Sequence, residues 1–382
     1  MHSDTVQLAK LIRKNPIKKI VVKVGSALLT KDDNTLNDTF LKSFVDQVAT
    51  LQKKGIQVLI VTSGAVAAGR SEVTLKKESK TIPYRQALSA VGQIVLMDKY
   101  RELFSKYNIS VGQALLTDHD FQNRESFLTM RNTLDLLMQM GVVPIVNEND
   151  VVTYVGFKFG GNDPLAAKVS SMLCVDAMVL LTDVEGLFTA NPHTNPDAKL
   201  LTQIDDVTDE IKSYASTTVS KKSLGGMITK IESAEYALHS GISTVIASGK
   251  IPNVLTDAVQ GRPFRGTVIG NGGDDRCGGR LMWMRSKAKK DIFVIVDDGC
   301  VRALRKNGSL LAVGIVEVCG EFERGDVVSV HDQASELIAF GQINYGSREV
   351  HIMRGRKTEE LAKLLPTFVE EEVMHRDNMV VT

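Results

Sequence analysis

Apolar residues along roughly the first 250 positions fall into two alternating patterns. Short runs rich in β-branched residues, typical of buried strands, recur at residues 20–24, 58–61, 111–116, 142–146, 179–181 and 243–247. Between them apolar side chains are spaced every three or four positions, as in Leu41, Phe44, Val45, Val48 and Leu51. That spacing is typical of amphipathic helices. Strands alternating with helices predict an α/β fold with an open, mostly parallel sheet sandwiched by helices.

Turn and cap residues divide these elements. Asn37 or Asp38 can cap the helix that follows the first strand, and Gly55 can end it. Residues 151–159 have the pattern of a hairpin. Asp163 is a candidate N-cap for the next helix, with Pro164 at the first helical position. Because Asp163 follows a Gly-Gly turn, it could equally orient nearby lysines.

The pattern changes beyond residue 271. Residues 271–290 are rich in glycine and basic side chains, and we interpret them as an interdomain connection. Short strand-like runs at residues 292–296, 311–318, 327–330 and 337–340, separated by turns, predict a small β-rich domain. We expect one domain over residues 1–272, a basic connector over 273–290 and a second domain over 291–382.

Charge and cysteine content limit the class of protein. The 46 Lys and Arg residues nearly balance the 45 Asp and Glu residues, so bulk charge gives no argument for a polyanionic partner. From Asp291 onward, 10 basic residues stand against 16 acidic ones, a net charge of −6. The four cysteines include no CxxC pair, which indicates reduced thiols, and the N-terminus has no long apolar run. We expect a soluble cytoplasmic protein without a membrane span.

Lys23 interrupts the first apolar run, at a position from which charge is normally excluded. It is either an edge-strand lysine that reaches water or the partner of an anion such as a phosphate. Gly25 and Ser26 would let the backbone come close to that anion. Residues 62–65 follow the second strand and open a helix of small residues, whose first N–H groups form a ready anion site.

Two further segments are candidates for chemistry. Residues 147–150, Asn-Glu-Asn-Asp, follow a predicted strand at the sheet edge where ligands bind in such folds, although ordinary turns have the same composition. Lys230 lies in the first turn of a helix that begins at Gly225 and Gly226, where a cation opposes the helix dipole. The sequence contains no GxxxxGK[ST] loop, no GxGxxG after the first strand and no HRD or DFG motif.

Five segments, in this order along the chain, resemble the glutamate 5-kinases of the amino-acid kinase family. They are residues 23–26, 61–70, 146–150, 181–187 and 225–230. The Thr-Ser-Gly-Ala sequence at residues 62–65 is specific, because other amino-acid kinases carry different Gly-rich loops there. Residues 374–379 resemble the end of the family's C-terminal PUA domain. The resemblance implies the amino-acid kinase fold followed by a PUA domain.

The resemblance also implies an activity, which is ATP-dependent phosphorylation of the γ-carboxylate of L-glutamate, the first step of proline biosynthesis. The residues that would contact phosphate are Lys23 and Lys230, with Asp163 organising the two lysines. Glutamate would be held by Ser63, Gly64, Ala65, Asn147, Asp150 and Asn162. The nucleotide would be held by Lys23, Gly25, Ser26, Thr182, Asp183, Gly225, Gly226, Met227 and Lys230. Mg²⁺ would accompany ATP, proline would act as a feedback inhibitor, and the chain would form homodimers or homotetramers.

Two positions depart from the family pattern. Gly161 stands where these kinases usually have an aspartate, and Ser223-Leu224 replaces a usual Gly-Thr. Both changes touch the expected active-site rim, and they leave open a low-activity sensor of glutamate or proline. A second alternative is an RNA-binding protein, because PUA domains occur in RNA-modifying enzymes. The acidic balance beyond Asp291 argues against RNA, whereas the basic connector keeps RNA binding open.

Overall fold

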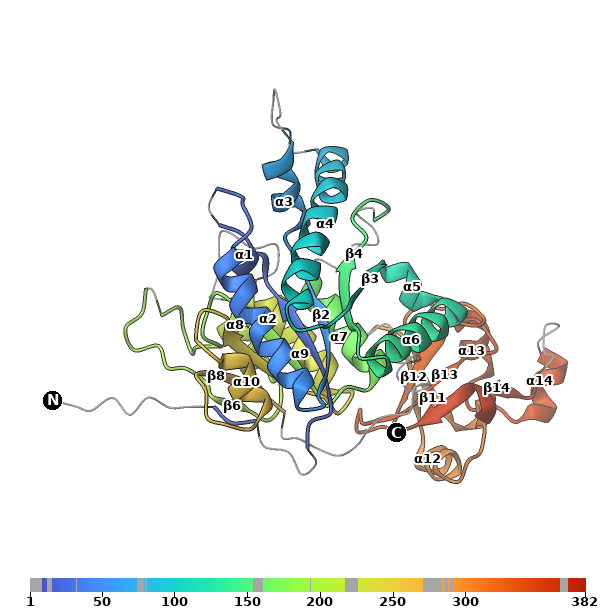
Figure 1. The fold of residues 1–382 in the computed structure, drawn as a ribbon. Coiled ribbons are helices and arrows are strands. Elements are labelled where there is room, and N and C mark those ends of the chain that lie inside the picture. Colours follow the sequence, from blue (N-terminus) through green and yellow to red (C-terminus); the bar gives the residue numbers. More distant parts are fainter. Residues whose placement is uncertain are drawn as a thin grey trace. The chain divides into compact units, whose positions relative to one another are not determined.

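The chain divides into two units, Met1–Cys277 and Gly278–Thr382, and no sheet in the described residues is shared between them (Figure 1). The computed structural model describes residues 9–11, 16–31, 33–73, 79, 81–153, 161–192, 194–216, 226–270, 284, 288, 291–364 and 370–382. Residues 154–159 of the expected hairpin, and all of the expected basic connector except residues 284 and 288, lie outside these ranges.

The first unit contains an eight-stranded sheet of order β3-β4-β2-β1-β5-β7-β8-β6. Its strands are β1 (Lys19–Val24), β2 (Gln57–Val61), β3 (Val111–Leu116), β4 (Val143–Glu148), β5 (Ala177–Thr182), β6 (Gln203–Ile204), β7 (Ser243–Ser248) and β8 (Gly266–Ile269). Neighbouring strands pair in parallel except β7 and β8, which are antiparallel. The predicted open, mostly parallel sheet is therefore confirmed.

Helices cover both faces of this sheet. They are α1 (Ser26–Leu29), α2 (Asp38–Lys53), α3 (Ala65–Glu72), α4 (Ile82–Ser105), α5 (Asp118–Gln122), α6 (Arg124–Gln139), α7 (Asn162–Leu173), α8 (Asp209–Ser216), α9 (Met227–Leu238) and α10 (Val254–Val259). Helices α2, α4 and α10 form one contacting group, and α6, α7, α8 and α9 form another. None of the helices in the described ranges is long and apolar enough to cross a membrane.

Local sequence signals account for several helix ends. The Asn37 side chain accepts a hydrogen bond from the N–H of Phe40 at 3.2 Å, so Asn37 is the cap of α2. Gly55 follows the helix with φ of 79°, a left-handed conformation that suits glycine. The prediction that Asp163 caps the next helix is wrong, because α7 begins at Asn162 with Gly161 as its N-cap, and Pro164 is therefore the third helical residue and not the first. The Asp163 carboxylate turns away from the helix end, toward two lysines.

The second unit is small and rich in strands, as predicted. A five-stranded sheet of order β11-β9-β12-β13-β15 lies beside a two-stranded sheet, β10-β14. The strands are β9 (Phe293–Val296), β10 (Leu310–Leu311), β11 (Ile315–Cys319), β12 (Val327–His331), β13 (Leu337–Gln342), β14 (Glu372–Met374) and β15 (Met379–Val381). Its helices are α12 (Asp298–Arg305), α13 (Ser347–Met353) and α14 (Thr358–Leu364), with short 3₁₀ turns at Ala312–Gly314 and Arg376–Asn378.

The single strand expected at residues 311–318 is two strands of different sheets. A 3₁₀ turn at Ala312–Gly314 separates them. There the chain passes so close to α12 that a Cβ on Gly314 would lie 2.6 Å from the Cβ of Cys300. The local apolar run does not reveal this contact with α12.

Helices α3 and α4 touch backbone to backbone. A Cβ on Gly92 of α4 would lie 1.9 Å from the carbonyl oxygen of Ala65, and one on Gly69 of α3 would lie 2.0 Å from that of Leu88. Real Cβ atoms do not approach backbone atoms this closely, so both positions require glycine. The contact fixes the start of α3, and with it residues 62–65, relative to α4.

We predict that Gly92→Ala destabilises the first unit by about 1–3 kcal/mol or more, because α3 and α4 must move apart. The matched control is Gly112→Ala, where a new Cβ would meet only side-chain atoms, at 3.4 Å. Urea unfolding followed by circular dichroism measures both variants. Equal unfolding midpoints for Gly92→Ala and Gly112→Ala would contradict the backbone contact.

Candidate active site

A cavity of about 580 Å³ opens at the carboxyl ends of the central strands. This is the edge at which open α/β sheets bind ligands, and the volume suits a small-molecule site. The predicted site residues that line it are Lys23, Gly25, Ser26, Ser63, Gly64, Ala65, Asn147, Asp150, Asn162, Asp163, Thr182, Asp183 and Lys230. Gly226 and Met227 lie at the start of α9, close in sequence to Lys230, and Gly225 lies outside the described residues.

Lys23 is not an edge-strand residue. Its strand, β1, lies between β2 and β5, where Lys23 pairs with Val61 on one side and Leu180 on the other. The residue is only 6% exposed. The alternative of a lysine that reaches water from a sheet edge is therefore wrong, and the ammonium group faces the cavity.

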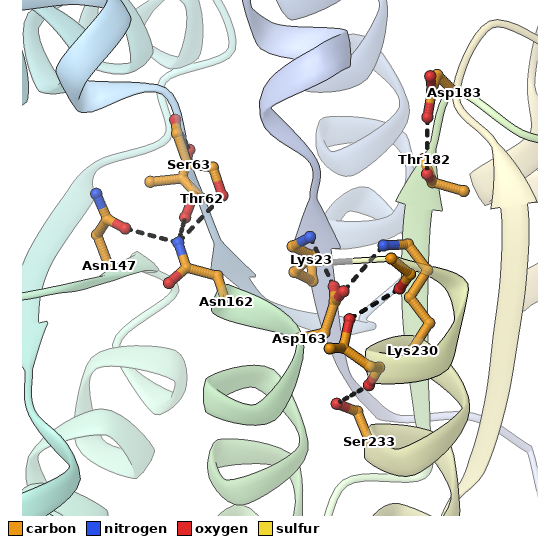
Figure 2. A network of polar contacts seen from close by, with 12 residues as sticks. Lys23, Thr62, Ser63, Asn147, Asn162, Asp163, Thr182, Asp183, Lys230 and Ser233 are labelled. Atoms are coloured by element: carbon orange, nitrogen blue, oxygen red, sulfur yellow. Dashed lines mark hydrogen bonds and ion pairs between the residues drawn. The ribbon is translucent and has the colours of Figure 1, made fainter. Parts of the chain in front are cut away.

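Asp163 lies between two buried lysines, as Figure 2 shows. Its Oδ1 is 2.6 Å from Lys23 Nζ, and its Oδ2 is 2.9 Å from Lys230 Nζ. The three side chains come from β1, α7 and α9 and are 8%, 3% and 7% exposed. Two ammonium groups and one carboxylate leave an excess of one positive charge in this buried cluster.

The surroundings shift the ionisation of this cluster. Burial lowers the pKa of Lys23 below 10.5; the attraction of Asp163 opposes this shift, and the charge of Lys230 adds to it. Burial would raise the pKa of Asp163, but the charges and hydrogen bonds of Lys23 and Lys230 hold it below 3.8. Asp163 is therefore a carboxylate at neutral pH, and an anion in the cavity would offset the remaining positive charge.

A second polar cluster lies beside the first. Asn162 Nδ2 donates to Asn147 Oδ1 at 2.8 Å, to Ser63 Oγ at 3.1 Å and to the carbonyl oxygen of Thr62 (Figure 2). These contacts join the ends of β2 and β4 to the start of α7. Asp150, just beyond β4, lines the same cavity. Amide, hydroxyl and carboxylate groups of this kind can bind a small zwitterionic molecule.

The start of α3 offers backbone donors to the cavity. Gly64 is its N-cap, with φ of 94°, and no side chain caps the helix. The first residues of α3, from Ala65 to Ala67, line the cavity. Uncapped N–H groups at a helix start attract anions, so this turn can bind a carboxylate or phosphate.

Gly161 accounts for one departure from the family pattern. Its φ is 133° and its ψ is 170°, a backbone conformation that is essentially restricted to glycine. An aspartate at this position would be strained. The backbone conformation at Gly161 therefore disfavours the aspartate that the family usually has at this position.

Two arginines that line the cavity were not predicted from the sequence. Arg70 and Arg85 line the cavity from α3 and α4. The Nε of Arg70 is buried and has no hydrogen-bond partner among the described residues. Arg70 lies less than two turns after Gly64 on the same helix, a spacing that could have identified it.

The fold and the buried lysine pair define the class of this protein. Residues 18–248 match the model of the amino acid kinase family, and residues 293–365 match that of the PUA domain. The predicted combination of an amino-acid kinase unit and a PUA domain is confirmed.

Relatives that match nearly the whole chain give the particular family. The glutamate 5-kinase of Caldanaerobacter subterraneus subsp. tengcongensis is 40% identical, over 95% of this chain and 97% of its own. The glutamate 5-kinase of Dehalococcoides mccartyi is 38% identical over 96% of this chain and 99% of its own. That of Geobacter sulfurreducens is 40% identical over 96% of this chain and 98% of its own. The chain belongs to the glutamate 5-kinase family.

We predict that Asp163→Asn destabilises the first unit by about 3–5 kcal/mol at pH 7, because two buried ammonium groups lose their shared carboxylate. The lowered pKa of Asp163 means that its contribution is present above pH 3.8 and is lost at lower pH as the carboxylate protonates. The variant should lack that part of the acid dependence. Urea unfolding at several pH values measures it.

Asp98→Asn is the control for this prediction, because Asp98 is 64% exposed and pairs with Arg101 of the same helix. Its effect should stay below about 1 kcal/mol. Equal effects of the two substitutions would show that the buried cluster does not depend on Asp163.

Proposed function

We propose that this chain transfers the terminal phosphoryl group of ATP to the γ-carboxylate of L-glutamate, which gives L-glutamyl 5-phosphate for proline biosynthesis. The observation that carries this proposal is the buried Lys23–Asp163–Lys230 cluster, with its excess positive charge, beside a cavity edged by Asn147 and Asp150. The names of the relatives support the choice of glutamate.

The chemistry needs no general base. A γ-carboxylate is already ionised at neutral pH, so its oxygen can attack the terminal phosphorus directly. The bond from that phosphorus to the bridging oxygen breaks, and the electron pair leaves with ADP. Catalysis then consists of aligning two anions and neutralising charge on the transferring group, which Lys23 and Lys230 supply. Asp163 holds the two ammonium groups at a fixed separation.

The remaining residues divide between the two substrates. Ser63, Asn147 and Asn162 would hold glutamate carboxylate oxygens, and Asp150 would pair with its ammonium group. The backbone of Gly64 and Ala65 would add N–H donors. Lining or flanking residues that would contact the nucleotide are Gly25, Ser26, Thr182, Asp183, Gly226 and Met227.

Mg²⁺ would enter with ATP. Within the described ranges, no group of three or more His, Cys, Asp or Glu side chains is arranged to hold a metal ion. Kinase sites commonly bind Mg²⁺ through substrate phosphates and one or two carboxylates, and Asp183 at the cavity wall can supply one. The ion would neutralise phosphate charge that the two lysines leave uncompensated.

The proposal includes three properties that the family resemblance supports. These are cytoplasmic location, inhibition by proline and assembly as homodimers or homotetramers. RNA binding is not favoured, because residues 291–382 carry a net charge of −6. A sensor of glutamate would differ from the proposed kinase, because it would bind glutamate without phosphorylating it.

Glutamate-dependent release of ADP by the purified protein tests this function. We expect turnover with L-glutamate, and a kcat/KM for N-acetylglutamate lower by about a hundredfold or more, because an acylated amine leaves Asp150 without a positively charged partner. Aspartate is the control for chain length. Absence of glutamate-dependent ADP release would reject the kinase and favour the sensor, whereas comparable kcat/KM for N-acetylglutamate would reject the role of Asp150.

We predict that Lys230→Met lowers kcat by on the order of 10²–10³, the scale for one preorganised donor, with little change in the KM for glutamate. The control is Lys212→Met, which removes a lysine on α8 that binds Glu235 at 2.8 Å outside the cavity. Steady-state kinetics measures both variants. A kcat for Lys230→Met within a few-fold of wild type would show that Lys230 does not stabilise the transferring phosphoryl group.

A further inference from the structure

Helix α4 directs two buried polar side chains toward the second polar cluster of the cavity. Ser89 and Gln93 are four residues apart, so they lie on the same face of the helix, and they are 4% and 7% exposed. Ser89 Oγ donates to Asp150 Oδ2 at 2.7 Å, and Gln93 Oε1 accepts from Asn147 Nδ2 at 2.8 Å. Neither residue lines the cavity, whereas Asp150 and Asn147 both do.

The Ser89 hydroxyl does not make the local bond that several other helical serines of this protein make. Ser71, Ser105 and Ser233 each donate to a backbone carbonyl one turn earlier in their own helix, at 2.7, 2.8 and 2.6 Å. That local bond is the usual one for a serine within a helix. Ser89 instead bonds a carboxylate 61 residues away in sequence. The contact holds one oxygen of Asp150 and leaves Oδ1 for a substrate ammonium group.

Gln93 fixes the orientation of an amide in the same way. By accepting from Asn147 Nδ2, it leaves Asn147 Oδ1 to accept from Asn162 Nδ2 at 2.8 Å. Its own Nε2 is buried and has no partner among the described residues. A buried donor without a partner lowers stability, so fold stability alone does not explain a glutamine here.

Helix α4 is itself fixed against both sides of the site. Gly92 touches the backbone of Ala65 and Gly69 in α3, which places the helix against the start of α3. On the other side, Gln86 Nε2 donates to the carbonyl oxygen of Thr153 at 3.0 Å, just beyond Asp150. The helix therefore connects the Ser63–Ala65 turn to the segment that follows β4.

We propose that Ser89 and Gln93 are positioning residues for the amino-acid substrate, which orient Asp150 and Asn147 without touching the substrate. Both roles rest on the proposed function, because they assume that Asp150 and Asn147 bind glutamate. A positioning role predicts weaker glutamate binding with unchanged nucleotide binding, a split that general loss of stability would not produce.

Ser89→Ala should raise the KM for glutamate about tenfold, the scale for a lost hydrogen bond to a charged group, and leave the KM for ATP within about twofold. Ser89→Thr keeps a hydroxyl and should recover most of that loss. Ser105→Ala is the matched control, because it removes a hydroxyl from the same helix that donates to the carbonyl oxygen of Glu102. Gln93→Met should raise the KM for glutamate in the same way, with Gln139→Met, an exposed position on α6, as its control.

A double-mutant cycle tests whether Ser89 acts through Asp150. In an Asp150→Asn background, Ser89→Ala should change the kcat/KM for glutamate by less than about twofold. A full tenfold effect in that background, or equal changes in the KM values of glutamate and ATP, would overturn the positioning role. A Ser89→Ala variant with the same KM for glutamate as an active wild-type protein would also overturn it. A wild-type protein without glutamate-dependent ADP release would overturn the proposed function and this role together.

Discussion

One buried carboxylate between two buried lysines is the interaction on which the site depends. Lys23, Asp163 and Lys230 come from β1, α7 and α9, which are separate in sequence and adjacent in the fold. Such a cluster is a poor source of stability, because desolvation of three charges offsets most of their attraction. Its net positive charge instead suits a site that receives anions. The buried charges are therefore better explained by the binding of an anion in the cavity than by the stability of the fold.

The parallel sheet provides the geometry that this cluster requires. Strands β1, β2, β4 and β5 end at one edge, so the short segments after them meet around a single cavity. The lysine cluster and the cluster of Asn147 and Asn162 lie side by side there (Figure 2). The first suits a transferring phosphoryl group and the second an amino acid. The glycine contact between α3 and α4 keeps the wall of the second cluster in place.

Sequence patterns predicted the elements better than their long-range contacts. The strand and helix alternation was enough for the parallel sheet, and a lysine inside an apolar run marked Lys23 as unusual. Asp163 has the local signature of a helix cap, but its partners are 140 and 67 residues away. Ser89 and Gln93 look like ordinary helix residues, because their partners lie 61 and 54 residues away. Local sequence patterns do not predict contacts between residues so far apart in the chain.

The central claim is that Lys230 stabilises the transferring phosphoryl group more than it stabilises bound nucleotide. Calorimetric titration with ADP, Mg²⁺ and tetrafluoroaluminate in the presence of glutamate tests this claim at equilibrium, because the complex mimics the transition state. We predict that Lys230→Met loses on the order of 10²-fold in affinity for the complex and binds ADP within a few-fold of wild type. Equal losses for ADP and for the complex would contradict the claim.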